Sequence, residues 1–408
     1  MKARWEIWLA VAALSVGLLL LAVLGLWGYM SLTATPLHPD PDDVPSVSGV
    51  APSRRWAAAA ERGRRIARAA LAEQNLPGLS IAVGFGDDVV WAEGFGWADL
   101  ESQVPVGPDT AFRIGTLSVV LTSAAVGVLV EEGRLELDED IRTYVPEFPK
   151  TPWRVTLRHL MGHLAGVRND GGDEGPLLAE HCDRPVEALP HFASSPLLFE
   201  PGTRFHYSSY GWILVSAAVE AAANEPFFSF MRTAVLEPLA LDGTRLDAVI
   251  EPAAADRATS YFPRFAADPR YGLHLMRPVD HSCYAGAAAF VSTPSDLVRF
   301  GLAVNAGRLL RPATVRLLQT PQRLASGEET GYGLGWKLDT AVLAGERVRI
   351  AGHDGLLLGG TAASLLTLPE RRIAVAVISN ISYADTATLA ARLAEAFLEA
   401  AGTPADRS

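Results

Sequence analysis

Residues 7–30 form a run of 24 residues without one charge, and no other feature of the chain constrains its fold as strongly. As a helix, the run is long enough to cross the hydrocarbon core of a bilayer. A buried core helix of this length rarely lacks a polar face, and none is visible here. A secretory signal has a shorter apolar region and a small-x-small cleavage site, whereas residues 32–34 (LTA) provide a poor one. We therefore predict an uncleaved transmembrane anchor over residues 1–31, with a cleaved signal peptide as the alternative.

Charges on either side of this run predict its orientation. Lys2 and Arg4 precede it, and aspartates follow it at positions 40, 42 and 43. The positive-inside rule then places the N-terminus in the cytoplasm and the rest of the chain outside it, in the periplasm if the host is bacterial. Residues 32–52 are rich in Pro and Asp and lack apolar periodicity, so we expect an extended linker that lifts the folded part off the membrane. One folded domain is predicted over residues 53–404.

The charge and cysteine content of the 408-residue chain argue against several classes of function. A formal net charge of −11 argues against binding to the phosphate backbone of nucleic acids, which requires clustered cations. Cys182 and Cys283 have no zinc-site spacing, and the sequence leaves open whether they form a disulfide. Lysine occurs only at positions 2, 150 and 337, so few amines are available for catalysis. The sequence indicates no cofactor, because the glycines near residues 84–96 flank hairpin strands and no helix follows them.

The order of the predicted elements indicates an α+β fold. Helices are expected near both ends of the domain, over residues 54–74 and 386–401. A hairpin with strands at 79–85 and 89–95 follows the first helix, and an almost continuous apolar run over 117–130 predicts a buried helix. Further short strands are expected at 332–337, 347–351, 362–368 and 373–379. This order predicts one sheet built from both ends of the chain, with a helical insert.

Four segments in a fixed order carry the chemical signal. They are residues 112–119 (FRIGTLSV), 159–166 (HLMGHLAG), 201–211 (PGTRFHYSSYG) and 352–355 (GHDG). This ordered set resembles the beta-lactamase-like serine hydrolase family, of the class C beta-lactamase and penicillin-binding protein type, over roughly residues 55–400. Residues 144–149 (YVPEFP) and 163–168 (HLAGVR) look closest to the membrane-anchored mitochondrial branch of that family.

The resemblance implies a fold and a mechanism. The implied fold is the beta-lactamase/DD-peptidase-like one, an antiparallel sheet flanked by helices and packed against an all-helical subdomain, with a cleft between them. In that family a serine hydroxyl at the start of a buried helix attacks a carbonyl, and the helix N-terminus favours the developing negative charge. A lysine one turn later in a Ser-x-x-Lys motif accepts the proton. A tyrosine assists the transfer, and a Lys-Thr-Gly or His-x-Gly motif lines the cleft.

In this chain the Ser-x-x-Lys pair of the family is replaced. Thr116 stands at the serine position and Val119 at the lysine position. The site residues carried over by the resemblance are Thr116, Tyr207 and His353 as catalytic positions, and Ser209 and Gly355 as substrate-binding positions. For Tyr207 a buried structural tyrosine is the alternative, and for His353 a solvated histidine at a strand edge.

The replaced pair leaves two hypotheses, and whether the chain is an enzyme stays open. Valine cannot take a proton, while a lysine deprived of its hydroxyl partner would be an orphan charge in a buried helix. We therefore predict a catalytically impaired protein that binds a peptide or acyl small molecule in its cleft; for a bacterial host the resemblance suggests peptidoglycan-type peptides. The alternative is an active acyl hydrolase, of esterase, peptidase or beta-lactamase type, in which Tyr207 is the general base for Thr116.

Two histidines four residues apart raise the question of a metal site. His159 and His163 have the spacing of helical zinc ligands, but Leu160 stands where the zincin motif has a glutamate. We therefore expect hydrogen-bonded structural histidines and no metal.

Overall fold

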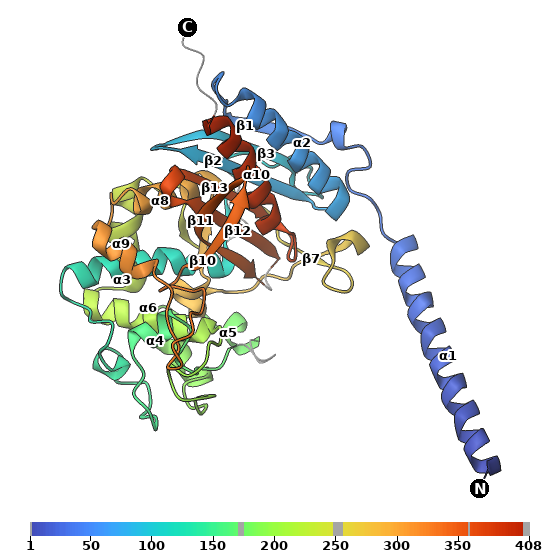
Figure 1. The fold of residues 1–408 in the computed structure, drawn as a ribbon, viewed down its shortest axis with the longest axis horizontal. Coiled ribbons are helices and arrows are strands. Elements are labelled where there is room, and N and C mark those ends of the chain that lie inside the picture. The colour runs from blue at the N-terminus through green and yellow to red at the C-terminus, as the bar shows by residue number, and fades with distance from the viewer. Residues whose placement is uncertain (1, 170–174, 248–255, 358–359, 403–408) are drawn as a thin grey trace.

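The computed structural model describes residues 2–169, 175–247, 256–357 and 360–402. An antiparallel sheet forms the centre of the domain, with two long helices on one face and a helical region on the other (Figure 1). Its strand order is β1-β3-β2-β13-β12-β11-β10, and β4 pairs with β3. The strands are β1 (Ser46–Val50), β2 (Gly78–Phe85), β3 (Asp88–Asp99), β4 (Val104–Pro105), β10 (Lys337–Leu343), β11 (Glu346–Leu357), β12 (Thr361–Leu368) and β13 (Ile373–Ser379). This arrangement confirms the predicted fold class.

The sheet is built from both ends of the chain, as predicted, because β2 pairs along its whole length with β13. Successive side chains of a strand point to opposite faces of the sheet. On β13 the larger Ile373, Val375 and Val377 pack in one core, and the smaller Ala374 and Ala376 pack in the other. The first core lies under α2 (Ala57–Gln74) and α10 (Thr386–Gly402), both close to their predicted ranges. The last two residues of the predicted domain, 403–404, lie outside the described residues.

The other face of the sheet carries α8 and the helical region. The helices are α3 (Ser118–Glu131), α4 (Leu157–Met161), α5 (Gly175–Ala179), α6 (Ser209–Ala223), α7 (Phe227–Met231), α8 (Pro294–Asn305) and α9 (Pro312–Leu318). Short strands add two small sheets, one from β5 (Phe112–Arg113), β9 (Phe290–Ser292) and β6 (Arg245–Leu246), and one from β7 (Tyr261–Pro263) and β8 (Leu273–Leu275). Short 3₁₀ or π turns are η1 (Pro41–Asp43), η2 (Gly115–Leu117), η3 (Ile141–Thr143), η4 (Pro185–His191), η5 (Arg232–Leu236), η6 (Glu237–Leu239), η7 (Pro269–Tyr271), η8 (Ser282–Ala287) and η9 (Pro369–Arg371).

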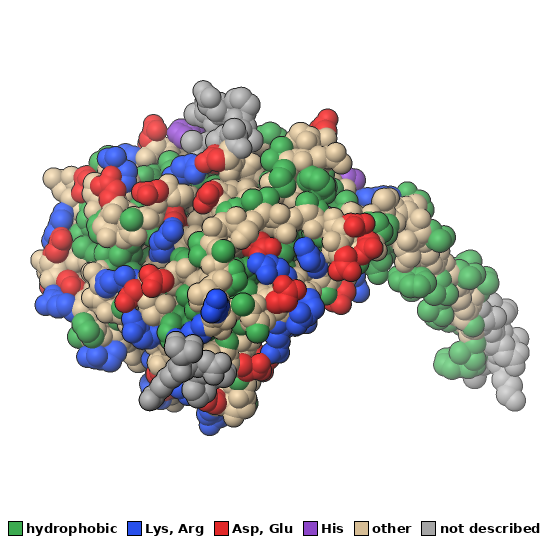
Figure 2. Space-filling view, turned by 90° about the horizontal axis from the view of Figure 1, so that it is seen from above, with side chains coloured by type: hydrophobic (Ala, Val, Ile, Leu, Met, Phe, Trp, Pro, Cys, Tyr) green, Lys and Arg blue, Asp and Glu red, His purple; other side chains and the backbone are tan. Residues whose placement is uncertain are grey.

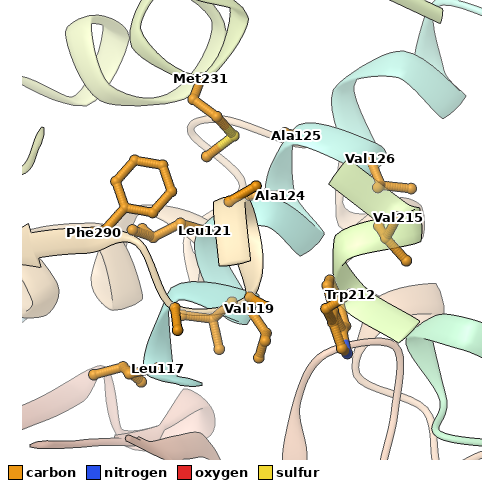
Figure 3. Packing of buried hydrophobic residues seen from close by; sticks show 14 of the residues in the cluster. Leu117, Val119, Leu121, Ala124, Ala125, Val126, Trp212, Val215, Met231 and Phe290 are labelled. Atoms are coloured by element: carbon orange, nitrogen blue, oxygen red, sulfur yellow. The ribbon is translucent and has the colours of Figure 1, made fainter. Parts of the chain in front are cut away.

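Helix α3 lies in the middle of the second core. Figure 3 shows its apolar side chains among those of α6, α7 and β9, including Trp212, Met231 and Phe290. Its buried polar side chains bond to backbone carbonyls: Thr122 to Gly286 at 2.9 Å, and Ser123 to Leu334 at 2.6 Å. Because a buried hydroxyl without a partner is unfavourable, these bonds allow a helix that is buried on all sides to carry polar residues. The predicted buried helix is therefore confirmed.

The N-terminal helix α1 (Lys2–Leu32) projects away from the domain (Figure 1). Its stretch Val11–Leu32 is long and apolar enough to cross a membrane, and none of that stretch is buried against the domain. Hydrophobic side chains cover this helix, whereas acidic and basic side chains are mixed over the domain surface (Figure 2).

The segment expected to be an extended linker is attached to the domain along much of its length. Residues 46–50 form β1, which pairs with β3 at the edge of the sheet. The side chain of Asn75 accepts a hydrogen bond from the Leu37 N–H at 2.7 Å and donates one to the Thr35 carbonyl at 3.2 Å. The composition did not reveal this because the side chains of β1 are almost all exposed, so an edge strand held by its backbone shows no apolar periodicity.

Two further differences concern the C-terminal strands and the cysteines. Residues 332–337 were predicted to be a strand, but they form a loop with one isolated bridge, and β10 begins only at Lys337. The loop turns because Gly331 and Gly335 adopt φ values of 68° and 91°, a region that favours glycine. Cys182 and Cys283, whose pairing the sequence left open, form a disulfide.

Candidate active site

Thr116 lies in η2, the turn that leads into α3, and this turn packs against β11. Its hydroxyl donates a hydrogen bond to the backbone carbonyl of Asp354 at 3.3 Å. The contact requires a glycine at the next position of β11, because a Cβ on Gly355 would lie 2.0 Å from the carbonyl oxygen of Ile114. Gly355 therefore lies at the contact between the turn and the strand, and the substrate contact expected for it stays a prediction.

Val119 lies one turn further along, where the family motif has its lysine. Its side chain is 0% exposed and belongs to the second core (Figure 3). The neighbouring Ser118 is no substitute nucleophile, because its hydroxyl donates to the Gly115 carbonyl at 2.7 Å and is buried. Among the described residues, the Thr116 hydroxyl therefore has the Asp354 carbonyl as its acceptor, and the alkyl side chain of Val119 stands where the family has the lysine amine.

His353 lies on β11 and bonds through both ring nitrogens. Nδ1 is 2.7 Å from the Asp354 carbonyl oxygen, so this nitrogen carries the proton and donates it. Nε2 is 2.8 Å from the Tyr332 hydroxyl oxygen and accepts a hydrogen bond from this hydroxyl. Burial lowers the pKa of His353 to about 4, in spite of the bond to the Asp354 carbonyl, which works in the opposite direction. The imidazole is therefore neutral at physiological pH, in one tautomer.

Tyr207 lies beside both His353 and His163. The ring centroids of Tyr207 and His163 are 4.1 Å apart, and those of Tyr207 and His353 are 6.3 Å apart. His163 accepts a hydrogen bond from the Ser208 N–H at 3.1 Å through Nδ1, and burial lowers its pKa well below the usual value. His163 is therefore a neutral, hydrogen-bonded histidine.

Ser209 follows this segment as the first residue of α6 and was predicted to contact substrate. Its side chain is only 4% exposed, and its backbone N–H donates to the side-chain oxygen of Asn169 at 2.8 Å. Ser208, rather than Ser209, caps the helix, because its hydroxyl accepts the Gly211 N–H at 3.0 Å. The structure thus links Thr116 to His353 through the Asp354 carbonyl, places the Tyr207 ring near that of His353, and buries the Ser209 side chain.

Tyr332 belongs to the site but was not among the site residues predicted from the sequence. It is 5% exposed, and its hydroxyl holds His353. Burial raises the pKa of Tyr332 well above its ordinary value, with the nearby Tyr207 hydroxyl adding to the shift, so it remains a phenol and a donor. Its sequence context, an aromatic residue between Gly331 and Gly335, indicates a turn and was misinterpreted as a strand.

Lys337 is the described lysine nearest to the site along β10 and β11, but it lies on the reverse face of the sheet. It forms an ion pair of 2.8 Å with the carboxylate of Asp354, which also accepts a bond from Ser364 at 2.9 Å. Ser364 in turn bonds to Thr386 of α10, so these side chains lie on the α10 face. Because strand residues alternate between faces, the side chains of Asp354 and His353 point in opposite directions.

Within the described residues, no group of three or more His, Cys, Asp or Glu side chains is arranged to hold a metal ion. The described side chains of the site supply hydroxyls, a neutral imidazole and aromatic rings.

Comparison with known proteins identifies the family and agrees with the fold. The chain is 26% identical over 448 residues to the human "Serine beta-lactamase-like protein LACTB, mitochondrial", covering 85% of this chain and 81% of that protein. It is 25% identical over 296 residues to Penicillin-binding protein 4* of Bacillus subtilis, covering 70% and 64% of the two chains. Among solved structures, the octameric penicillin-binding protein homologue from Pyrococcus abyssi superimposes with a TM-score of 0.71 at 23% identity, over 83% of this chain and 77% of that one.

A second structural relative is the D-amino acid amidase from Ochrobactrum anthropi SV3, with a TM-score of 0.69 at 21% identity over 84% of this chain and 98% of the other. At these identities both structures support the fold and nothing finer. The family model named Beta-lactamase matches residues 64–398, which is most of the domain. The chain therefore belongs to the beta-lactamase family.

Proposed function

We propose that this beta-lactamase-family protein is a membrane-anchored binding protein whose cleft does not form an acyl-enzyme. The observation that carries the proposal is the buried Val119 at the position of the general base, next to a Thr116 hydroxyl that bonds to a backbone carbonyl. A threonine hydroxyl attacks a carbonyl only if a base removes its proton, and an alkyl side chain cannot do so.

The other titratable groups of the site support the same conclusion. His353 accepts a hydrogen bond from the Tyr332 hydroxyl at Nε2 and donates one from Nδ1–H to the Asp354 carbonyl. Neither nitrogen is therefore free to deprotonate Thr116. Lys337 is bound to the Asp354 carboxylate on the other face of the sheet. The active-hydrolase alternative requires Tyr207 to act as the general base, and the lysine that accepts the proton in the family is replaced here by Val119.

Covalent labelling of the full-length protein in detergent tests the proposal. We expect no labelling by a fluorophosphonate or a fluorescent penicillin, and the same result for Thr116→Ala. Labelling that is present in the wild type and lost in Thr116→Ala would establish an acyl hydrolase and overturn the proposal.

Restoring the motif provides the complementary test. In the double variant Thr116→Ser/Val119→Lys, the hydroxyl regains a base one turn away, and we expect penicillin labelling to appear. Thr116→Ser alone is the matched control and should stay unlabelled, because its base is still missing. If the single variant labels as well as the double variant, the missing lysine is not what prevents acylation.

We further propose that α1 is retained as an anchor, with the domain on the non-cytoplasmic side. The length and exposure of Val11–Leu32 and the basic residues that precede it support this topology. Intact-mass spectrometry of the full chain from a bacterial membrane fraction should show an uncleaved N-terminus, and the protein should stay in the pellet at alkaline pH. Protease added to spheroplasts should digest the domain; a protected domain would contradict the proposed orientation.

A further inference from the structure

We infer that residues 261–277, which include β7, β8 and the turn between them, form a second membrane contact of this protein. This segment, here called the β7–β8 hairpin, lies in the headgroup region beside the end of α1 and binds anionic phospholipids. Its role depends on the proposal that α1 is a retained anchor, because only then is a bilayer present at this height. Contacts with α1, the short chain between α1 and the domain, and the exposed side chains of the hairpin support this role.

The hairpin touches the end of α1 that leads into the domain (Figure 1). The ring centroids of Phe265 and Tyr29 are 6.1 Å apart, in an edge-on arrangement. Arg264 donates to the carbonyl and to the hydroxyl of Thr33, at 3.3 Å each, and its guanidinium lies 5.9 Å from the centroid of the Tyr29 ring. A cation at the C-terminus of a helix is favourable, because it satisfies the last carbonyls and complements the helix dipole. The hairpin is therefore fixed to the last turn of the apolar helix.

These contacts determine the height of the hairpin relative to a bilayer. Tyr29 belongs to the 22-residue stretch Val11–Leu32, which is long and apolar enough to cross a membrane. A helix of this length rises about 33 Å, close to the thickness of the hydrocarbon core, which is about 30 Å. Tyr29 stands near the end of the stretch, where tyrosine and tryptophan rings commonly lie between hydrocarbon and headgroups. Because Phe265 packs against Tyr29, it reaches the membrane interface when α1 spans the bilayer.

The chain between α1 and the domain is too short to hold the domain away from the membrane. The side chain of Asn75 binds the backbone of residues 35 and 37, and the buried His38 ring bonds to a backbone carbonyl at 3.0 Å. Only residues 33 and 34 lie between α1 and this attachment, and two extended residues span at most about 7 Å. The headgroup region on each side of a bilayer is about 5–8 Å thick. The domain surface beside α1 therefore lies in or directly on the headgroups.

The exposed side chains of the hairpin suit this position. Leu275 is 64% exposed and, with Val342, is one of the two most exposed large apolar side chains in the described part of the domain. Arg277 is exposed, and the described residues offer it no hydrogen-bond or ion-pair partner. A role as a cap for α1 alone explains Arg264 and leaves both of these side chains unexplained.

The charge of the hairpin favours anionic lipids over neutral ones. Residues 261–277 contain three arginines and one aspartate, which gives a formal charge of +2 with histidine neutral, in a chain of net charge −11. Arginine binds phosphate oxygens strongly, and basic residues near a membrane are attracted to its anionic lipids. Apolar side chains beside the basic ones add burial in the interface, as in other interfacial membrane contacts.

Fluorescence quenching by nitroxide-labelled lipids measures the depth of the hairpin. The full-length protein is reconstituted in liposomes of phosphatidylcholine and phosphatidylglycerol, with one fluorophore on a single introduced cysteine. The two native cysteines form a disulfide and do not react with the label. The labelled variants are Ala267→Cys at the exposed turn of the hairpin, Leu24→Cys within α1, and Asp88→Cys as the control.

Asp88 is a suitable control because it is exposed and lies at the other end of the sheet from the hairpin. The hairpin is joined to the sheet just beyond Ser379, where the Tyr261 N–H donates to the Asn380 carbonyl at 2.8 Å. Asp88 follows the turn after β2, at the opposite end, where Phe85 pairs with Ile373.

We expect a nitroxide on the lipid headgroup to quench the probe at position 267 several-fold more strongly than the probe at position 88. A nitroxide on the acyl chain should quench the probe at position 24. Equal quenching at positions 267 and 88, with quenching at position 24 intact, overturns the role of the hairpin and leaves the anchor standing. If the probe at position 24 is not quenched, the anchor proposal fails, and the role of the hairpin fails with it.

Charge and apolar variants, each with the probe at position 267, test the chemistry of the contact. Leu275→Glu should reduce headgroup quenching in all liposomes, and Arg277→Glu should reduce it only when phosphatidylglycerol is present. The matched controls are Val342→Glu and Arg347→Glu, because these exposed residues pair across β10 and β11 at the far end of the sheet. Both controls should leave the quenching unchanged.

Thermal denaturation checks that each variant is folded, which we expect because all four side chains are exposed. Quenching that is unchanged in both Leu275→Glu and Arg277→Glu, or lowered equally in the controls, overturns the role of the hairpin. Quenching of the parent probe that does not depend on phosphatidylglycerol overturns the preference for anionic lipids. None of these outcomes bears on acylation of Thr116, which covalent labelling tests separately.

Discussion

His353 is held neutral inside the protein, and this makes its contribution to stability depend on pH. The unfolded chain has a histidine pKa of about 6.5, whereas burial lowers the pKa of His353 in the fold to about 4. Between these two values the unfolded state binds more protons than the folded state. The stabilisation is therefore fully present above pH 6.5 and is lost as the pH falls toward 4.

We predict that His353 makes the free energy of unfolding fall by up to about 3 kcal/mol between pH 7 and pH 4. Urea titrations of the wild type and of His353→Asn at pH 7, 6, 5 and 4 measure this contribution as the difference between the two curves. Other histidines whose pKa is lowered by burial and that do not interact with His353, such as His38 and His281, are present in both proteins and cancel. Parallel curves would show that His353 is not the group that titrates.

At the same scale, the sequence predicted part of the site and missed the rest. Thr116 and His353 were recognised from the family motifs, and the Asp354 carbonyl brings them together. Tyr332 belongs to no such motif, and its role arises from a loop that meets β11 only in the folded protein. Ser209 was assigned from the motif, although a helix start can turn its first side chain inward as readily as outward.

At the scale of elements, the contact between η2 and β11 sets the position of Thr116. We predict that Gly355→Ala lowers the free energy of unfolding by about 1–3 kcal/mol, because its Cβ would overlap the Ile114 carbonyl oxygen and force the turn away from the strand. Urea unfolding followed by circular dichroism measures the effect.

The matched control for that substitution is Gly211→Ala in α6. A Cβ on Gly211 would meet its nearest neighbour, Leu160, at 3.6 Å, which is an ordinary contact. Alanine favours helices over glycine, so this variant should be unchanged or more stable by up to about 1 kcal/mol. Equal losses in both variants would mean that the overlap at Gly355 is relieved without cost.

Elements with a strong apolar pattern were the ones that the sequence predicted well. The buried α3 and the central strands β2 and β13 carry their burial in the side chains, so their composition reveals them. The edge strand β1 is held by backbone hydrogen bonds and exposes its side chains, so no apolar periodicity in the sequence indicates it. The attachment of residues 35–38 depends on the side chains of Asn75 and His38, which bond to backbone groups, and the composition did not reveal it either.

At the scale of the whole molecule, the Cys182–Cys283 disulfide joins positions 101 residues apart. A crosslink that closes a long loop restricts the unfolded chain, and we predict that Cys182→Ala/Cys283→Ala lowers the free energy of unfolding by about 2–5 kcal/mol. Reductant should destabilise the wild type by a similar amount and leave the double variant unchanged. A wild type that is insensitive to reductant would contradict the prediction.

The disulfide also bears on where the domain resides. Structural disulfides persist in oxidising compartments and are rare in the cytosol. The bond therefore agrees with the proposed extracytoplasmic position of the domain, an argument independent of the charges that flank α1.

The pairing of β2 with β13 also determines when the protein can fold during its synthesis. Leu79 pairs with Ser379, so the first hairpin leaves the ribosome about 15–60 s before its partner strand, at a translation rate of about 5–20 residues per second. During that interval β2 presents an unpaired apolar edge that can bind other chains. A chain exported across a membrane meets this hazard on the far side, and a holding chaperone in that compartment should raise the yield of folded protein.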